Sequence, residues 1–421
     1  MELKTKYDVV VVGGGFAGVG AALAAAREGK KVRLIEKYNA LGGAAVYDLV
    51  NPFMRYWAWK DDERKEKIML SAGIFAEMCR RHKEAGGASE DGWQAEIFKI
   101  ILDDMAVEAG VEVLFHNKLV EVLTDGRRIT AVRTAGRQGL CEYRADFFID
   151  TTGDGDLLAK AGCAYQLGRE SDSLCQPMTT CFRMGGVDLD LFTKEKPYLL
   201  QAYNALQASG EIRNTRENIL TFYGLGHHVL HLNTTRVVKH NPISDAEISA
   251  AEIEARRQVL EIFSFLRKYS RACEHAYIVS IAPEIGVRES RKLKGVHVLT
   301  GQELRDCTVF PDTIALGNYD IDIHNPEGSG TYIYTFAQDE YFRIPYRSLL
   351  PVECDNLLVA GRCLSADHEA HSAVRIMPIC ACMGQAAGLA AALAKRSDTT
   401  AHGVDIKALQ ELLVQNGAEI R

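Results

Sequence analysis

The feature that most constrains this chain is a glycine-rich turn between two apolar segments near its start. Residues 8–12 are mostly β-branched and predict a buried parallel strand. Residues 17–28 are rich in alanine and predict a helix, and residues 31–35 predict a second strand. The turn between the first strand and the helix carries the G-x-G-x-x-G spacing, as Gly13, Gly15 and Gly18. This order of strand, turn, helix and strand predicts a Rossmann-like unit that binds a dinucleotide.

Each residue of this motif has a physical reason. Gly13 makes the tight turn out of the strand, and Gly15, which has no Cβ, lets a pyrophosphate approach the backbone. Gly18 lets the helix lie close to the sheet, and the helix N-terminus presents free N–H groups to the phosphates. Glu36 ends the second strand, where its carboxylate can accept hydrogen bonds from both hydroxyls of an adenosine ribose.

The composition is typical of a soluble enzyme and argues against two classes of partner. The chain has 421 residues, 47% of them apolar and 25% charged, so it can bury sizeable cores. A net charge of −7 gives no reason to expect nucleic acid or an anionic membrane surface. Residues 9–26 are apolar enough to suggest a membrane segment, but their glycines lie at turn spacing. The 11 cysteines are scattered without a C-x-x-C pair, which favours a cytoplasmic location.

A second cofactor-binding signal lies in the middle of the first half of the chain. Residues 111–150 form short alternating segments that predict a β-meander returning to a parallel strand. That strand runs into the turn TTGDGD at residues 151–156, a layout typical of FAD-binding domains of the glutathione-reductase type. Much later, residues 356–360 predict another buried parallel strand, and residues 379–395 predict a helix that can begin at Pro378.

We therefore expect an α/β protein in which a Rossmann-like FAD-binding domain, with a parallel sheet and a β-meander, is interrupted by an inserted α+β substrate domain. The predicted divisions are 1–160 for the first part, 161–345 for the insertion and 346–421 for the return segment. Residues 61–84 predict a charged amphipathic helix, and residues 227–238 alternate like a strand of the inserted domain.

Several motifs, taken in order, carry a resemblance to a known family. They are YDVVVVGGGFAGVGAALAAA, the LGG turn, TTGDGD, GVRESRKLKG, IPYRSLLP and NLLVAGRCLSA, followed by VRIMP and GQAAGLAAALA. With them the chain resembles the FAD-dependent oxidoreductases, a family distantly related to the fumarate reductase and succinate dehydrogenase flavoproteins. The resemblance implies noncovalent FAD, a cofactor domain built from both ends of the chain, and a substrate domain inserted over the flavin.

The resemblance also assigns residues to the cofactor by position. The glycine turn would hold the pyrophosphate, Glu36 with Lys37 the ribose, and the later positions the adenine, ribitol and isoalloxazine. The assigned residues are Gly13, Gly15, Gly18, Glu36, Lys37, Gly43, Ala44, Val120, Thr152, Gly153, Gly361, Arg375 and Met377. The chain lacks a His-Pro-Thr triplet or other dicarboxylate signature of fumarate reductases, so their substrate is not carried over.

Four residues are candidates for the chemistry beside a flavin. Arg375 precedes the last long helix and is the first choice for an active-site cation, with a structural salt bridge as the alternative. His368 and His371 flank the same loop as a candidate acid or base, although surface positions are the alternative. His231 alternates with neighbouring polar residues and could face the substrate, but a sheet face packed on polar partners is favoured.

No metal site is expected. The HHxxH trio invites a metal interpretation, but residues one and four apart do not share a face of a strand. Arg288, Glu289 and Arg291 are more simply explained as an ion-pair network between domains than as a catalytic set.

The sequence thus predicts an FAD-dependent oxidoreductase that transfers a hydride between a small organic substrate and flavin N5. The alternatives are a reductase of activated C=C bonds, an electron-transfer subunit that needs a partner protein, and a protein in which FAD is structural. The middle region has no second G-x-G-x-x-G, which argues against a built-in NAD(P)H domain but leaves open NAD(P)H acting directly at the flavin. The substrate and the oligomeric state are not predicted.

Overall fold

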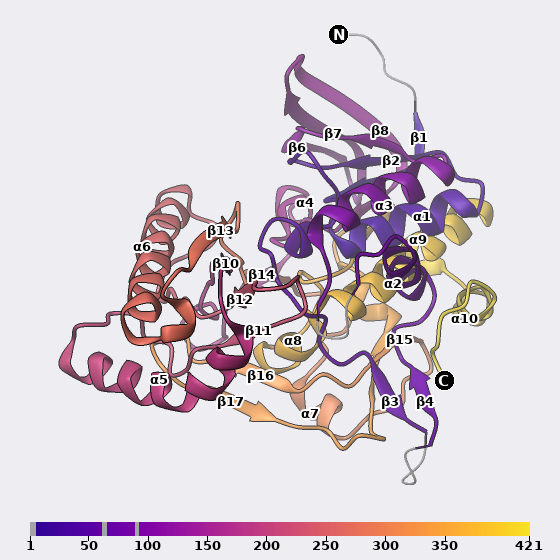
Figure 1. Ribbon diagram of the computed structural model, residues 1–421. Coiled ribbons are helices and arrows are strands. Elements are labelled where there is room, and N and C mark those ends of the chain that lie inside the picture. Colours follow the sequence, from indigo (N-terminus) through magenta and orange to yellow (C-terminus); the bar gives the residue numbers. More distant parts are fainter. Residues whose placement is uncertain (1–5, 61–64, 89–91) are drawn as a thin grey trace.

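One sheet, assembled from both ends of the chain, holds the glycine turn. The computed structural model describes residues 6–60, 65–88 and 92–421 (Figure 1). The strands of this sheet run in the order β5-β2-β1-β8-β7-β6, and β19 pairs with the other edge of β8. Those that pair in parallel are β1 (Tyr7–Val12), β2 (Val32–Ile35), β5 (Glu112–Leu114), β8 (Gly139–Asp150) and β19 (Leu357–Val359). β1 therefore lies inside the sheet, flanked by strands on both edges, as its continuous apolar sequence requires.

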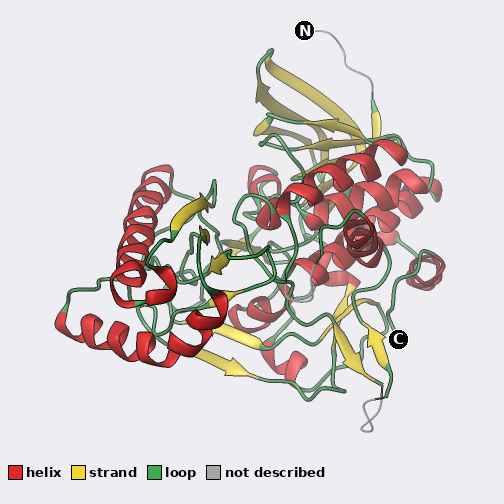
Figure 2. Cartoon of the chain, in the orientation of Figure 1, coloured by secondary structure: helices red, strands yellow, loops and turns green. Residues whose placement is uncertain are grey.

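Strand β8 belongs to two layers at once. Its first half pairs antiparallel with β7 (Arg128–Gly136), which pairs with β6 (Lys118–Asp125) to form the meander. Its second half pairs in parallel with β1, with Val12 opposite Asp150. Figure 2 shows the strands of the sheet and meander grouped at one end of the molecule, with helices packed alongside them. The predicted α/β fold with a parallel sheet and a β-meander is confirmed.

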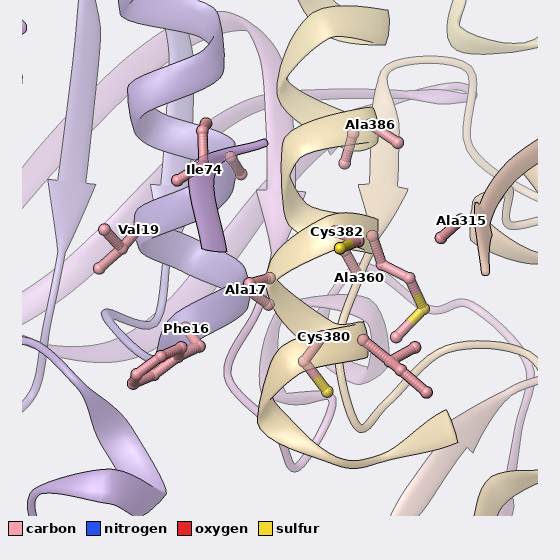
Figure 3. Close-up of a cluster of buried hydrophobic side chains, with 14 of the residues drawn as sticks. Phe16, Ala17, Val19, Ile74, Ala315, Ala360, Cys380, Cys382 and Ala386 are labelled. Carbon is pink, nitrogen blue, oxygen red and sulfur yellow. The ribbon is translucent and has the colours of Figure 1, made fainter. Parts of the chain in front are cut away.

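Two helices far apart in the sequence pack directly against each other. α1 (Phe16–Arg27) follows the glycine turn, and α9 (Met377–Arg396) comes near the end of the chain. Figure 3 shows Ala17 of α1 directed toward α9, where Cys380 and Cys382 lie. α9 is long and apolar enough to cross a membrane by length and composition, but 94% of its most apolar window is buried inside this protein. It is therefore the central helix of the core.

The middle of the chain forms a separate α+β layer. Its antiparallel sheet has the order β11-β12-β10-β13, and two long helices cover one face of it (Figure 1). The elements are β10 (Phe182–Gly185), α5 (Leu189–Ser209), β11 (Thr221–Phe222), β12 (Leu230–Leu232), α6 (Asp245–Tyr269) and β13 (Tyr277–Ile281). Leu230 and Leu232 point into the core shared with these helices, so His231 between them points to the opposite face.

The remaining helices and strands range from 3 residues in β3 to 14 in α3. They are β3 (Trp57–Trp59), β4 (Lys67–Met69), α2 (Ile74–Glu84), α3 (Ala95–Glu108), α4 (Asp156–Lys160), β9 (Tyr165–Leu167), β14 (Arg291–Leu293), α7 (Gly301–Arg305), β15 (Thr313–Gly317), β16 (Ile321–His324), β17 (Thr331–Tyr334), β18 (Phe342–Pro345), α8 (His368–Val374) and α10 (Ile406–Gln415).

Two predicted elements are shorter than expected. The helix predicted over 61–84 begins only at Ile74, and residues 61–64 lie outside the described residues. The strand predicted over 227–238 is reduced to β12, because His228 adopts a positive φ of 63° that no strand residue takes.

The predicted domain divisions stay a prediction, but the apolar core bears on the boundary predicted at residue 346. The core that contains α1 and α9 also takes in Leu299, Phe310 and Ile344, which precede the predicted boundary at 346. The return to the cofactor-side core therefore begins before β18, because β15 packs on α9.

Candidate active site

A single cavity of about 760 Å³ extends from the glycine turn to the middle layer. This volume lies in the upper part of the range for ligand sites in proteins. The predicted cofactor residues that line it are Gly13, Gly15, Glu36, Lys37, Gly43, Ala44, Thr152, Gly153, Gly361, Arg375 and Met377. Segments widely separated in the sequence thus meet around one space.

The glycine turn is shaped for a ligand rather than for side chains. Gly13 has a positive φ of 104°, and a Cβ there would lie 2.6 Å from the carbonyl carbon of Thr151. A Cβ on Gly18 would overlap the carbonyl oxygen of Gly13, so this glycine serves helix packing, and it does not line the cavity. A Cβ on Gly15 would meet nothing closer than the Cα of Gly43, 3.8 Å away. The space in front of Gly15 is therefore open.

Glu36 is a buried carboxylate at the end of β2. Only 6% of its surface is exposed. Its side chain accepts hydrogen bonds from the backbone N–H of Gly14 at 2.6 Å and of Tyr38 at 2.9 Å. Burial raises its pKa above the ordinary value, and the two N–H groups oppose that rise. Each oxygen still has a free lone pair, so the carboxylate can accept hydrogen bonds from ribose hydroxyls.

The turn after β8 closes the opposite side of the cavity through an ion pair. Gly153 and Gly361 both have positive φ, 77° and 87°. Asp154 accepts from Arg362 at 2.8 Å and from the hydroxyl of Ser290 at 2.7 Å. Burial alone would raise the pKa of Asp154, but the positive charges of Arg362 and of Lys37 lower it overall. The Gly-Arg pair after β19 is thus matched by a carboxylate from the TTGDGD turn.

One predicted cofactor residue, expected to meet the adenine through its backbone, lies beside the lining of the cavity rather than in it. Val120 does not line the cavity, and 38% of its surface is exposed. Its neighbours Asn117, Lys118 and Leu119 line the cavity instead. Successive residues of β6 point to opposite faces, which turns Leu119 inward and Val120 outward.

The far end of the cavity is polar and comes mostly from the inserted segment. Its lining includes two more arginines, Arg216 and Arg288, together with Tyr319, Asp322 and His324. Neither Arg216 nor any member of the segment around β16 was a sequence candidate. Arg288 was interpreted as part of an ion-pair network, which is wrong, because its guanidinium donates to the carbonyl oxygen of Pro177 at 2.6 Å and to the hydroxyl of Thr179 at 2.7 Å.

A hydrogen-bond network orders the residues of this polar end. The hydroxyl of Tyr319 donates to Asp322 at 2.7 Å, and Nε2 of His324 lies 3.3 Å from the same carboxylate. A guanidinium N–H of Arg236 donates to Nδ1 of His324 at 3.1 Å, which leaves the ring proton on Nε2. Burial and the charge of Arg288 lower the pKa of His324 to about 3, so the ring is neutral at pH 7.

Among the described residues that line this cavity, none is one of the three predicted catalytic histidines. His231 is fully buried on the sheet of the middle layer, and both ring nitrogens lack a hydrogen-bond partner among the described residues. His371 is also buried, and its Nε2 lies 2.9 Å from the carbonyl oxygen of Arg362. His368 lies 2.9 Å from the buried carboxylate of Glu289. These three rings thus lie outside the lining of the cavity, whereas Arg375 lies in it.

Glu289 and Arg291 do form ion pairs. Glu289 is fully buried, pairs at 2.5 Å with the equally buried Lys292 three residues along the chain, and lies 2.9 Å from His368 of α8. Arg291 pairs with Asp156 at 2.9 Å. Among the residues that the structure describes, no group of three or more histidine, cysteine or acidic side chains is arranged to hold a metal ion.

The residues on the nucleotide side fit FAD. The N-terminus of α1 has no capping side chain, so its free N–H groups face the space in front of Gly15. A buried carboxylate stands at the end of β2, and the cavity continues past Gly43 and Ala44 to Arg375 and Met377.

Comparisons with known proteins agree with this geometry. The model of the family described as FAD dependent oxidoreductase matches residues 8–413. A digeranylgeranylglycerophospholipid reductase of Methanoculleus marisnigri is 26% identical over 200 residues, which are 45% of this chain and 48% of that protein. A second reductase of this name, from Methanopyrus kandleri, is 29% identical over 200 residues, 44% of this chain and 46% of the relative. The match thus spans about half the length of these curated relatives.

Solved structures give a weaker likeness. A geranylgeranyl bacteriochlorophyll reductase-like protein of Thermoplasma acidophilum has a TM-score of 0.46 at 14% identity, over 98% of this chain and 84% of the other. A p-nitrophenol 4-monooxygenase of Pseudomonas putida has a TM-score of 0.48 at 12% identity, over 98% and 85%. The family match, in contrast, covers the cofactor cradle and both layers of the fold. The chain belongs to the FAD dependent oxidoreductase family.

Proposed function

We propose that this enzyme transfers a hydride between a small organic substrate and N5 of noncovalently held FAD. The observation that carries the proposal is the single cavity, which joins the dinucleotide cradle to the polar end formed by Arg216, Arg288 and the β16 segment. A cofactor and a substrate placed in one continuous space can exchange a hydride without a relay.

The chain divides the work between the two ends of the cavity. Gly13 and Gly15, with the N-terminus of α1, would hold the pyrophosphate, and Glu36 would hold the ribose. Gly43, Ala44 and Met377 would lie along the flavin, which supplies the redox chemistry when bound.

Arg375 is the proposed active-site cation. It lines the cavity, and its Nε is buried without a hydrogen-bond partner among the described residues. A buried donor left without an acceptor is costly, so a ligand atom at this point would satisfy it. We propose that Arg375 orients the substrate beside the flavin.

The proposed location is the cytoplasm, and the proposed partner is a small-molecule substrate. All 11 cysteines are free thiols, which is the usual state in a reducing compartment.

A second candidate function is the reduction of an activated C=C bond. It is favoured by the curated relatives, which are named as reductases. The digeranylgeranyl group in their names is a long hydrocarbon, whereas three arginines line the polar end of this cavity. We therefore rank this function second, with a polar rather than a prenyl substrate.

The first experiment is an anaerobic visible spectrum of the purified protein, before and after addition of NADH, NADPH and then dithionite. Rapid bleaching by a pyridine nucleotide would identify a reductase. Bleaching by dithionite alone would indicate a dehydrogenase or oxidase fed by an organic donor, or an electron-transfer subunit that needs a partner protein. A protein that binds no flavin even after reconstitution with FAD would contradict the proposal.

Replacement of Arg375 by alanine tests its role once a substrate is known. We expect turnover to fall by about a hundredfold or more, because positioning of the reactants is lost, while the FAD content stays unchanged. Unaltered turnover with FAD bound would remove Arg375 from the active site.

A further inference from the structure

The polar end of the cavity carries more positive charge than the protein balances. Arg216, Arg288 and Arg375 line it together. None of the three makes an ion pair with any residue that the structure describes. Among the described residues, Arg288 donates to the neutral oxygens of Pro177 and Thr179, and Nε of Arg216 donates to the amide oxygen of Asn218 at 3.1 Å.

Arg216 is buried, and Arg288 and Arg375 are partly buried, so removal from water disfavours their charges. Burial, followed by the charges of Arg375 and Arg216, lowers the pKa of Arg288 to about 9. Burial also lowers the pKa of Arg216, which has only 5% of its surface exposed. Like charges without a counter-ion destabilise a fold, so their retention at one place needs a compensating negative charge.

The acidic groups nearby do not supply that charge. Glu217 pairs with Arg236 at 3.1 Å, and Asp320 faces Arg55 at 3.9 Å. Asp322 is the single remaining carboxylate among the described residues at this end, and it accepts from Tyr319. Three guanidinium groups therefore face one carboxylate.

The other acids of the cavity belong to its nucleotide end. Asp48, Asp154 and Glu284 interact with Lys37 and Arg362 there. His324 adds no charge at pH 7, because its Nδ1 accepts from Arg236. The uncompensated positive charge thus extends from Arg375, itself a predicted flavin contact, to Arg216 and Arg288 at the polar end of the cavity.

We propose that this end is a subsite for an oxyanion of the substrate, a carboxylate or a phosphate ester, bound by Arg216, Arg288 and Arg375. The inference rests on the proposed function for the identity of the ligand as substrate. Planar guanidinium groups bind such oxyanions through paired, charge-assisted hydrogen bonds. Tyr319 and His324, held by Asp322, border the same subsite and would fix the orientation of the bound group.

The test measures binding without turnover. The FAD-loaded enzyme is titrated with succinate, with inorganic phosphate and with succinamide, at constant ionic strength, and the flavin absorbance is recorded. We expect a saturable difference spectrum with succinate or with phosphate and none with neutral succinamide. Saturation by succinate alone assigns a carboxylate, and saturation by phosphate alone assigns a phosphate ester. Equal response to succinamide, or no response to either anion, overturns the subsite.

Arginine variants identify the residues responsible. Arg216→Gln and Arg375→Gln should each raise the dissociation constant of the effective anion by about tenfold or more, because a charge-assisted contact is lost. Arg183→Gln is the matched control, since Arg183 is also a part-buried arginine with unpaired nitrogens but does not line the cavity. If the control weakens binding as much as the other two, the assignment fails.

This outcome is independent of the hydride-transfer test. Anion binding in a protein whose flavin no organic donor or acceptor ever reduces or oxidises would contradict the proposed function and leave the subsite standing. Flavin turnover on neutral molecules, without anion binding, would do the reverse. Circular dichroism and FAD content of each variant show whether it is folded, and two cavity variants are used so that one that fails to fold does not decide the result.

Discussion

At the scale of single residues, neighbouring glycines of the same turn do different work. Gly18 has the carbonyl oxygen of Gly13 so close that any Cβ would overlap it. Gly15 has an ordinary negative φ of −70° and nothing in the protein within 3.8 Å of a built Cβ. Gly18 is thus required by the fold, and Gly15 by the ligand.

This difference predicts opposite outcomes for two alanine variants. Gly15→Ala should fold with near-normal stability in the absence of FAD but bind FAD at least about tenfold more weakly, because its methyl group occupies the space of the pyrophosphate. Gly18→Ala should lose about 1–3 kcal/mol of stability even without FAD, because backbone must shift to admit the methyl group. Urea unfolding of the apoproteins and FAD titration measure the two effects. Equal destabilisation by both variants would contradict this division.

Glu289 shows how a residue can hold the site without touching it. Its carboxylate binds Lys292 at 2.5 Å and His368 at 2.9 Å, and all of this lies in the interior. Burial opposes ionisation, but the hydrogen bond from His368 and the nearby positive charges lower the pKa of Glu289 to about 2. The contact between Glu289 and His368 therefore connects α8 to the segment that carries Arg288.

Removal of this carboxylate should be costly. Glu289→Gln leaves the ammonium group of Lys292 buried without its counter-ion, which typically destabilises a protein by about 3–5 kcal/mol. The control is Glu84→Gln, which breaks the exposed pair with Arg80 and should cost less than about 1 kcal/mol. Urea unfolding with saturating FAD compares the two. A similar small loss in both variants would show that the buried pair does not stabilise the fold.

The residues on the nucleotide side of the site could be predicted from the sequence, whereas the polar end could not. Gly13, Gly15 and Glu36 belong to one contiguous strand–turn–helix–strand unit, so their spacing alone indicates their roles. The polar end brings together Arg216, Arg288 and the residues of β16, which have no fixed spacing. His231 was a candidate because of its type and alternation, but the direction of a three-residue strand is decided by packing rather than by its own sequence.

At the scale of elements, the contact between α1 and α9 depends on residues without side chains. A Cβ on Gly384 would overlap the carbonyl oxygen of Ala17, and a Cβ on Gly388 would overlap that of Ala21. On the other helix, a Cβ on Gly20 would lie 2.6 Å from the carbonyl oxygen of Ala381. The helices therefore touch backbone to backbone, and this close approach sets the position of the glycine turn at the start of α1.

A single methyl group should separate these helices. Gly384→Ala should lower the free energy of unfolding by about 1–3 kcal/mol despite the better helix propensity of alanine, because the interface is overpacked. It should also weaken FAD binding, since α1 carries the phosphate-binding N-terminus. Gly328→Ala is the control, because a Cβ there meets nothing within 4 Å. A more stable Gly384→Ala protein would contradict backbone contact between the helices.

Element prediction from the sequence succeeded where the apolar pattern was long. The strands and the helix around the glycine turn, and the late helix α9, lie within a few residues of their predicted ranges. The helix predicted over 61–84 is too long at its N-terminal end. An amphipathic pattern of charged and apolar residues does not by itself show where a helix begins, and Gly73, with a φ of 69°, is the N-cap of α2.

At the scale of the whole molecule, buried neutral histidines make stability depend on pH. Burial lowers the pKa of His231 and of His324 to about 3, and it lowers the pKa of His371 well below its ordinary value. Each binds a proton in the unfolded chain near pH 6.5 but not in the folded protein until a much lower pH. The stability that these neutral histidines contribute to the fold is thus fully present above pH 6.5 and is lost as the pH falls from there toward 3.

The comparison with a histidine variant isolates one such contribution. Lowering the pH from 7.5 to 5 should cost the native protein about 2 kcal/mol more than it costs His231→Gln, because the variant has no ring to protonate on unfolding. Comparing the two proteins is necessary because burial also raises the pKa of Asp48 and of Asp150. These two carboxyl groups favour the folded state as the pH falls, so they oppose the histidines in the total pH dependence of stability. Urea unfolding at the two pH values measures it. Parallel losses in both proteins would show that His231 is protonated while folded.

The pairing of α1 with α9 determines when the core can close during synthesis. The first βαβ unit emerges early, but the helix that covers its apolar face is completed only at residue 396. Until α9 has been made, the nascent chain therefore carries an uncovered apolar surface, the kind of surface that chaperones bind and that promotes aggregation. We expect capture of the dinucleotide to follow the synthesis of α9, because this helix packs against the helix whose N-terminus faces the predicted phosphate site.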